Sequence, residues 1–344
     1  MFLRIKTRLQ QVALGATLGL VTTGLVWASG VEPLKETTKV HMTHVPSFGY
    51  SPVYIAVDKG YFADRGLDVE LMIVRGADTT YQVAGKTIEF SGGAADSAFF
   101  NSLHRGMPLI LISSLAQNRD DRSTNPLVVR KDLFDEGKVT DASQLKGLKV
   151  ANLAPGGITE YLLNSALAKG GLSIDDIDLI SPMGFGQMNE GLVTKAIDAG
   201  LLAEPLATMG ERRGTLERLV EDHDQGEQFL TVKTTADYAE ENPEIVQNFL
   251  IGLLMAARDL EENGFDSPEN MAIIEKYTKV DADTIKEAVL PKTGRNGSLN
   301  VDSIMAHQKY YQDRGYVRAE NLIEPSKFID TRYLEAAVKT LDEQ

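Results

Sequence analysis

The chain of 344 residues contains no cysteine, which excludes a disulfide framework and any metal site built on thiolates. It is also short of positive charge: 35 lysines and arginines stand against 49 aspartates and glutamates, for a net charge of −14. Nucleic-acid binding depends on Lys and Arg, so we expect no nucleic-acid partner. We interpret the acidic surface as one that keeps the protein in solution.

A long hydrophobic run is missing as well. The apolar stretch Val12–Val26 has about 15 residues, fewer than the roughly 20 that span a bilayer. It follows a basic start and precedes the small residues Ala28-Ser29-Gly30. This order predicts a cleaved secretory signal peptide over residues 1–30 rather than a membrane anchor. With no cysteine for lipid attachment, we expect a free protein in the periplasm of a two-membraned bacterium.

Helical and strand patterns alternate along most of the chain. Pro52–Tyr61 reads as a helix, a turn follows at Asp64-Arg65-Gly66, and Val69–Val74 reads as a strand. We expect a first α/β unit over residues 39–114, with a short strand at 88–90 and a helix at 94–105. A second unit includes strands at 149–152 and 178–181. Alternation of this kind indicates parallel sheets covered by helices.

Two polar segments, at residues 116–125 and 221–227, separate these units. We interpret both as places where the chain crosses from one unit to the other. From Asn242 onward the pattern is mostly helical, and Asn242-Pro243 is a good helix start.

Several motifs resemble one family of binding proteins. They are Ser51–Arg75 (SPVYIAVDKGYFADRGLDVELMIVR), Ser143–Val150 (SQLKGLKV), Ala196–Ala199 with Glu204-Pro205, and Asp237–Glu244 (DYAEENPE). In their order and spacing the chain is similar to the SsuA/THI5-like periplasmic solute-binding proteins of ABC importers, which take nitrate, sulfonates, taurine or thiamine precursors. The resemblance covers roughly residues 40–340. Ile88–Ser91 and Gly156–Thr159 depart from the family pattern.

The resemblance implies an α/β fold of the two-lobed periplasmic binding protein type II. Each lobe would be a mostly parallel sheet flanked by helices, with two crossing strands as a hinge. The expected divisions are a signal peptide (1–30), a lead-in (31–38), lobe 1 (39–118), lobe 2 (119–225) and a mostly helical return to lobe 1 (226–344). The expected partners are a small-molecule ligand, an ABC permease and its ATPase, and we expect a monomer.

Catalytic signatures are missing from the sequence: it has no Gly-x-Ser-x-Gly, no Walker loop and no His-Glu-x-x-His. We therefore expect no enzyme activity, no cofactor and no metal. Two other functions stay open, a ligand-sensing module for a membrane receptor and a THI5-like pyrimidine-synthesis enzyme. The second is disfavoured because those enzymes use a cysteine-rich segment.

Candidate ligand-binding residues follow from the rule that ligands lie beyond the carboxyl ends of strands in open α/β sheets. We select four loops that precede helix starts, where backbone N–H groups are free, together with the nearest arginine and a downstream glutamate. The residues are His44, Ser47, Phe48 and Tyr50; Ser91, Gly92 and Gly93; Gly156, Gly157 and Thr159; Gln187; Arg119; and Glu204.

Alternative roles exist for some of these residues. Phe48 and Tyr50 could stack on a planar ligand or simply plug the sheet edge, and Glu204 could be a solvated loop carboxylate. Oxyanion sites contain hydroxyl groups and often an arginine, and these loops contain few of either. The aromatic, amide and carboxylate groups slightly favour a small organic ligand over an inorganic anion.

Overall fold

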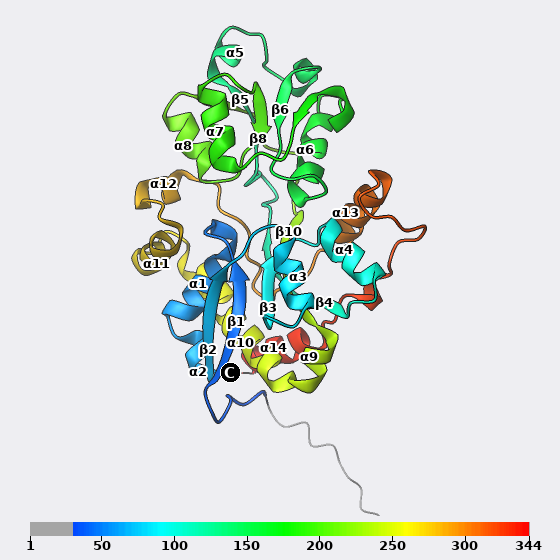
Figure 1. Cartoon of the computed structure of the whole chain (residues 1–344). Coiled ribbons are helices and arrows are strands. Elements are labelled where there is room, and N and C mark those ends of the chain that lie inside the picture. Colours follow the sequence, from blue (N-terminus) through cyan, green and yellow to red (C-terminus); the bar gives the residue numbers. More distant parts are fainter. Residues whose placement is uncertain (1–29, 344) are drawn as a thin grey trace, which may run out of the picture.

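The computed structural model describes residues 30–343, so the predicted signal peptide lies outside it except for Gly30. Two five-stranded sheets form the centres of two lobes (Figure 1). Lobe 1 is the body around β1 (Thr38–His44), β2 (Leu67–Ile73), β3 (Phe90–Gly93), β4 (Leu109–Gln117) and β10 (Gln228–Thr235). Lobe 2 is the body around β5 (Leu127–Arg130), β6 (Lys149–Ala151), β7 (Asp178–Ile180), β8 (Ala199–Leu201) and β9 (Leu216–Val220).

The two sheets share one strand arrangement. Their orders are β2-β1-β3-β10-β4 and β7-β6-β8-β5-β9. In each sheet the fourth strand alone runs against its neighbours: β10 is antiparallel to β3 and β4, and β5 is antiparallel to β8 and β9. Each reversed strand is the first one that the chain makes after crossing from the other lobe. This confirms the prediction of two mostly parallel sheets.

Helices cover both sheets. In lobe 1 they are η1 (Phe48–Tyr50), α1 (Ser51–Asp58), α2 (Tyr61–Asp64), α3 (Asp78–Ala84), α4 (Ser97–His104), α9 (Ala236–Glu241), α10 (Pro243–Asn263), α11 (Pro268–Thr278), α12 (Ala282–Glu287), α13 (Val301–Asp313), η4 (Pro325–Lys327) and α14 (Arg332–Asp342). In lobe 2 they are α5 (Lys131–Asp135), η2 (Ala142–Leu145), α6 (Ile158–Ala168), η3 (Ile174–Asp176), α7 (Phe185–Val193) and α8 (Leu206–Arg212).

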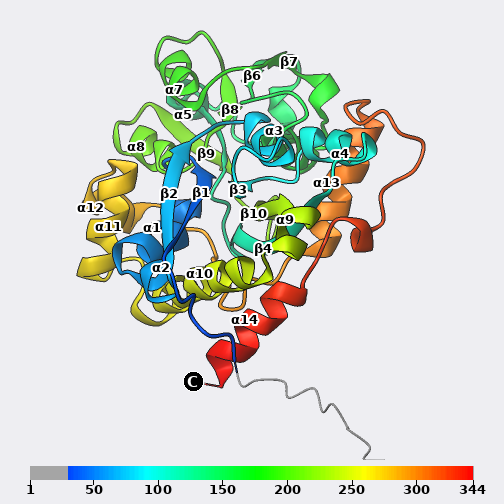
Figure 2. The same ribbon diagram turned by 60° about the horizontal axis from the view of Figure 1, so that its bottom comes forward.

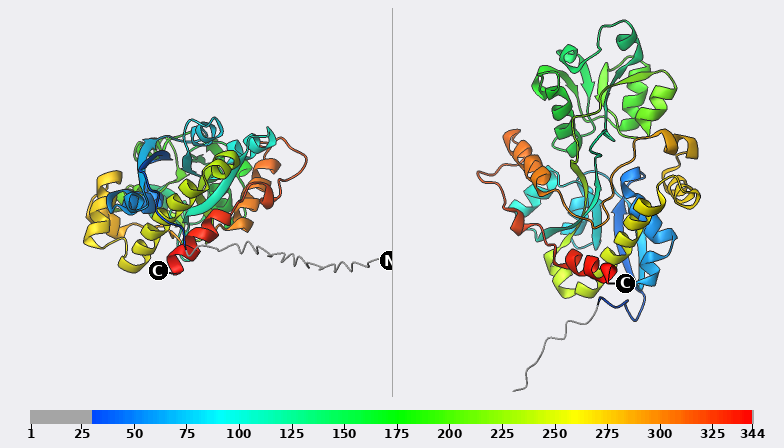
Figure 3. Two further views of the ribbon diagram at one scale, coloured as in Figure 1. Left: turned by 90° about the horizontal axis from the view of Figure 1, so that it is seen from below. Right: turned by 180° about the vertical axis from the view of Figure 1, so that it is seen from behind.

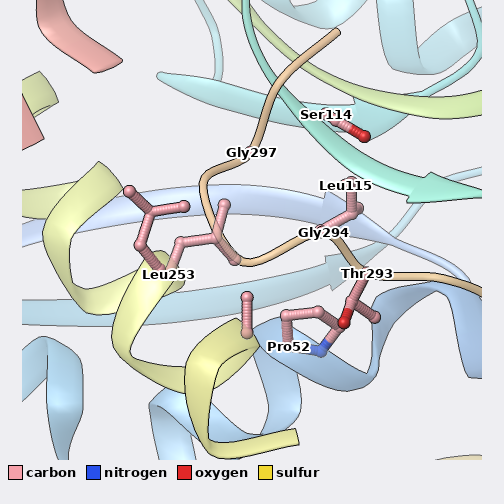
Figure 4. Close-up of a pocket in the computed structure, with 9 residues that line it drawn as sticks. Pro52, Ser114, Leu115, Leu253, Thr293, Gly294 and Gly297 are labelled. Atoms are coloured by element: carbon pink, nitrogen blue, oxygen red, sulfur yellow. The ribbon is translucent and has the colours of Figure 1, made fainter. Parts of the chain in front are cut away.

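The main core of lobe 1 lies between its sheet and α10. The Phe90 ring on β3 stacks on the Phe249 ring of α10 with centroids 4.0 Å apart. Helix α14 packs along the other side of α10 (Figure 2). Behind β4, a small pocket lined by Pro52, Leu253 and Gly297 is too tight to admit a water molecule (Figure 4). Lobe 1 is therefore densely packed behind β4.

Two segments, 118–126 and 221–227, connect the lobes (Figure 3, right). The Asp224 carboxylate accepts hydrogen bonds from Asn118 Nδ2 at 2.7 Å and from Ser123 Oγ at 2.6 Å. Burial raises the pKa of Asp224 to about 7. The segments thus lie side by side and are tied by a buried polar group. The lobe boundaries expected near residues 118 and 225 stay a prediction.

Two local expectations differ from the structure. The strand expected at 88–90 lies further on, at Phe90–Gly93, because Ser91 to Gly93 pair with Lys233 to Thr231 of β10. Helix α10 does begin at Pro243, but the Asn242 side chain makes no capping bond to it. Its amide donates instead to the Tyr238 carbonyl at 3.1 Å.

The lobes also touch on both sides of the crossing segments. On one side α13 packs against α6, and on the other α12 packs against α8 (Figure 1). The surfaces between these contacts are the carboxyl edges of the parallel strands, which is where the candidate loops lie. Within residues 30–343, every helix is too short or too polar to cross a membrane.

Candidate functional site

The third predicted loop contacts lobe 1 at the start of α4, a few residues after the second predicted loop. The backbone N–H of Ser97, at the start of α4, donates to the Gly156 carbonyl of lobe 2 at 3.2 Å. Gly156 has φ +64°, and a Cβ atom there would lie 2.6 Å from Ser97 Oγ. Only glycine fits both the left-handed backbone and this close approach.

The first predicted loop contacts the second through Tyr50. A Cβ atom on Gly92 would lie 2.3 Å from Tyr50 Cε1, so this glycine leaves room for the ring. His44 Nδ1 lies 3.2 Å from the hydroxyl oxygen of Tyr54, and burial lowers the pKa of His44. Ser47 donates its N–H to that hydroxyl at 3.4 Å. The first and second predicted loops therefore contact each other within lobe 1, and the third contacts lobe 1 through Gly156.

Phe48 packs into the protein instead of facing the other lobe. It is 3% exposed and belongs to a small core with Ile274, Ile285 and Ala288 of the α11–α12 region. This contact supports the plug interpretation of Phe48 over stacking on a ligand.

The lobe-1 residues after β1 and within β3 already have protein partners. The hydroxyl of Thr43 donates to Ser91 Oγ at 2.9 Å, and the hydroxyl of Thr231 donates to the Gly93 carbonyl at 2.9 Å. Ser91, Gly92 and Gly93 thus form paired strand rather than an open loop.

Three predicted site residues lie elsewhere or are already committed. Arg119 is exposed and pairs with Asp121 at 2.7 Å. The Gln187 side chain is exposed and accepts the Gly184 N–H at 3.1 Å, capping its own helix α7. Glu204 is buried and pairs with Arg218 at 2.7 Å, which contradicts the alternative of a solvated loop carboxylate.

Lobe 2, by contrast, leaves buried polar atoms without partners at its carboxyl edge. We name Asn152, Thr159 and Ser181 the lobe-2 edge residues. In the described part of the chain, Asn152 Oδ1, Thr159 Oγ1 and Ser181 Oγ are buried and have no hydrogen-bond partner. A buried polar atom without a partner costs free energy, so each such atom calls for an explanation.

The lobe-2 edge residues lie on one face of the sheet. Asn152 directly follows β6 and Ser181 directly follows β7, and the register Ala151↔Ile180 sets them side by side. Side chains alternate along strands, so both lie on the face of Val150 and Leu179, which α6 covers. Thr159 is in the first turn of α6, on the same helix side as the buried Leu162, Leu163 and Ala166.

A fully buried carboxylate joins the lobes beside this edge. Glu160 of α6 accepts hydrogen bonds from the hydroxyls of Tyr310 at 3.1 Å and Tyr316 at 3.0 Å, both from lobe 1. It also accepts the N–H of Gly156 at 3.3 Å. Arg314 Nε lies 3.9 Å from it. We name this cluster the Glu160 latch.

A buried cation lies on the lobe-1 side. Lys233 of β10 is fully buried, and its Nζ donates to the Ala94 carbonyl at 2.7 Å and to Thr80 Oγ1 at 3.3 Å. Burial lowers the pKa of Lys233 to about 8, against an opposing effect of the nearby Asp96 carboxylate. Burial raises the pKa of Asp96, against an opposing effect of Lys233.

Sequence reasoning selected Thr159 but missed Asn152, Ser181, Glu160 and Lys233. The sequence contained a usable signal for Asn152 and Ser181, because each is a polar residue that directly follows a strand. The strands expected at 149–152 and 178–181 included these two residues instead. Lys233 had no such signal, since it lies within β10 and follows no strand. Among the described residues, no group of three or more His, Asp or Glu is arranged to hold a metal ion.

Comparison with known proteins supports this architecture. The chain is 25% identical over 252 residues to the nitrate/nitrite binding protein NrtA of Nostoc, and the match covers 67% of this chain and 56% of that protein. The crystal structure of the periplasmic nitrate-binding protein NrtA from Synechocystis superposes with a TM-score of 0.74 at 17% identity, over 91% of both chains.

A second solved structure agrees. The alkanesulfonate-binding protein SsuA from Xanthomonas axonopodis, bound to MOPS, gives a TM-score of 0.69 at 15% identity, covering 87% of this chain and 100% of that one. At such identities these structures establish the fold alone, which is that of periplasmic binding proteins of type II. A model of the family described as NMT1/THI5 like matches residues 47–263, more than half of the chain. The chain belongs to the NMT1/THI5-like family.

Proposed function

We propose that the protein is the solute-binding component of an ABC import system and captures a small molecule between its two lobes. One observation carries the proposal: the start of α4 in lobe 1 and the loop before α6 in lobe 2 meet at the Ser97–Gly156 hydrogen bond. Beside that contact lie the buried, unpartnered polar atoms of the lobe-2 edge. Similar chains that bind nitrate or alkanesulfonate support the assignment.

The proposal extends to export and delivery. The protein would act in the periplasm after removal of residues 1–30, as a monomer that hands its ligand to a permease driven by an ATPase. Deleting the gene should abolish uptake of the ligand by intact cells, while permeabilised cells metabolise it normally.

Ligand-dependent closure is the structural step to test. The Glu160 latch connects α6 of lobe 2 to Tyr310 and Tyr316 of lobe 1. Its bonds exist only when the lobes are together, so removing them shifts the population toward separated lobes. The double variant Tyr310→Phe/Tyr316→Phe should therefore have a larger radius of gyration and bind its ligand several-fold more weakly.

The measurement is small-angle scattering with and without a compound first found by thermal shift, because binding to the folded state raises the melting temperature. Tyr277→Phe is the matched control, since the Tyr277 hydroxyl donates to Asp58 within lobe 1 at 2.7 Å. It should leave both the radius and the affinity unchanged. A wild-type profile that does not change at ligand saturation would contradict closure.

A further inference from the structure

We infer that the ligand carries an N–H or O–H donor that binds Asn152, and that it is an organic molecule rather than a bare oxyanion. This rests on the proposed function and names the class of its ligand. Three observations support it: the direction of the free atom on Asn152, the neighbours that share its face, and the carboxylate that caps α4.

The free atom of Asn152 is an acceptor. Asn152 Nδ2 donates to the Ala154 carbonyl at 2.9 Å, which fixes the orientation of the amide. Oδ1 therefore points away from that bond, and it is buried without a donor. Because an amide oxygen can only accept, a ligand that satisfies it must supply a proton. Nitrate, and any other fully ionised oxyanion, has none to give.

The neighbours on this face fit the same ligand end. Thr159 Oγ1 and Ser181 Oγ are also buried and unpartnered, and each hydroxyl can donate or accept. An amine, amide or hydroxyl group set among Asn152, Thr159 and Ser181 would satisfy all of them. A water molecule would as well, so a buried water is the alternative that the experiment must separate.

The N-terminus of α4 is already capped by the protein. A free helix N-terminus is a ready site for an anion, because its N–H groups are unpaired. At α4 the Asp96 carboxylate accepts the Phe99 N–H at 3.1 Å, so this carboxylate occupies the position that a bare oxyanion would need in lobe 1. No side chain caps α6, so at the lobe-2 edge the preference for a donor rests on Asn152 Oδ1.

The test uses compounds that differ only in the donor. Calorimetry and thermal shift on the mature chain would compare 2-aminoethanesulfonate and 2-hydroxyethanesulfonate with ethanesulfonate, 3-aminopropanoate with propanoate, and 4-aminopyrimidine with pyrimidine, with nitrate alongside. We expect a donor-bearing compound to bind at least about tenfold more tightly than its donor-free partner, because the partner leaves Asn152 Oδ1 unpaired.

Variants separate recognition from folding. Asn152→Leu should lower the affinity of the donor-bearing compound to that of its donor-free partner. Asn189→Leu is the control: Asn189 Oδ1 is also buried and unpartnered, but it lies on α7 near Gly210 of α8. That variant should leave the ratio between the two compounds unchanged. Thr159→Val, which keeps the shape of the side chain, guards against a folding defect at Asn152 and should also reduce the ratio.

The outcomes are distinct. Equal binding of donor-bearing and donor-free compounds, or tighter binding of nitrate, would overturn the inference and leave the proposed function standing. An unchanged ratio in Asn152→Leu would show that Asn152 holds only a water, which also overturns it. If only the donor-free compounds bind, the inference fails, whereas the proposed function fails if gene deletion leaves uptake by intact cells unchanged.

Discussion

The two lobes share one topology and differ in how they treat buried polar groups. Both sheets have the same strand order and the same single reversed strand. At the carboxyl edge of lobe 1, Thr43, Ser91 and Thr231 bond to one another or to backbone. At the matching edge of lobe 2, Asn152 Oδ1, Thr159 Oγ1 and Ser181 Oγ are buried atoms without partners.

This difference indicates that the two lobes have different roles. A satisfied edge adds stability, whereas an unsatisfied edge costs stability unless something outside the protein pairs with it. We infer that lobe 1 supplies a rigid platform with the Tyr50 ring against Gly92, and that lobe 2 supplies the polar groups that recognise the ligand. Lys233 is one exception in lobe 1, because its charge is buried without a carboxylate in direct contact.

Lys233→Met tests this exception and should give the largest effect. Burial lowers the pKa of Lys233 from 10.5 to about 8. Because the folded pKa lies below the unfolded one, the charge costs stability below pH 8, and the cost disappears as the pH rises through 10.5. Relative to Lys233→Met, the wild type should gain about 3 kcal/mol of unfolding free energy over that window.

Urea denaturation of both proteins at pH 7 and pH 11 measures the effect. Lys309→Met on the exposed side of α13 is the control and should show no comparable pH-dependent difference. If the unfolding free energies of Lys233→Met and wild type differed by the same amount at both pH values, Lys233 would not be a buried charge. It would then be no exception to the satisfied polar groups of lobe 1.

Valine at two of the four predicted site glycines, Gly92 and Gly157, sharpens the comparison. At Gly92 a Cβ atom would lie 2.3 Å from the buried Tyr50 ring, so Gly92→Val should cost about 2 kcal/mol or more by overpacking. At Gly157 the nearest atom would be the Ala154 carbonyl oxygen at 3.4 Å, and φ is −91°. Gly157→Val should therefore change stability by less than about 0.5 kcal/mol.

At Gly157 the valine substitution should affect ligand affinity more than it affects stability. A valine side chain at the start of α6 covers the backbone N–H groups there, so we expect at least about a tenfold loss of affinity for a compound found by thermal shift, equivalent to about 1.4 kcal/mol. Melting temperature and calorimetry on each variant separate the two effects. Unchanged affinity in Gly157→Val would show that this loop does not touch the ligand.

The sequence predicted the fold well because periodicity and breakers act locally. The βα alternation, both crossing segments and the start of α10 at Pro243 could all be predicted from short windows. The site was harder, because pairing between distant residues decides which polar groups are free. Ser91 Oγ accepts a hydrogen bond because Thr43 lies beside it on β1, and Asn152 Oδ1 is free because no donor folds onto it. The partners of Ser91 and Asn152 cannot be inferred from the residues next to them in the sequence.

Replacing one threonine in each lobe by valine gives the smallest expected effect and the most direct test of the comparison. Thr43 is fully buried and its hydroxyl donates to Ser91 at 2.9 Å, so Thr43→Val should cost about 1 kcal/mol. Thr159 is 6% exposed with an unpartnered hydroxyl, so Thr159→Val should leave the ligand-free protein as stable as the wild type or more stable, by up to about 1 kcal/mol. Urea denaturation without ligand measures both changes. Equal costs for the two variants would mean that the Thr159 hydroxyl has a partner such as a held water in the ligand-free protein, and the contrast between a satisfied and an unsatisfied edge would no longer hold.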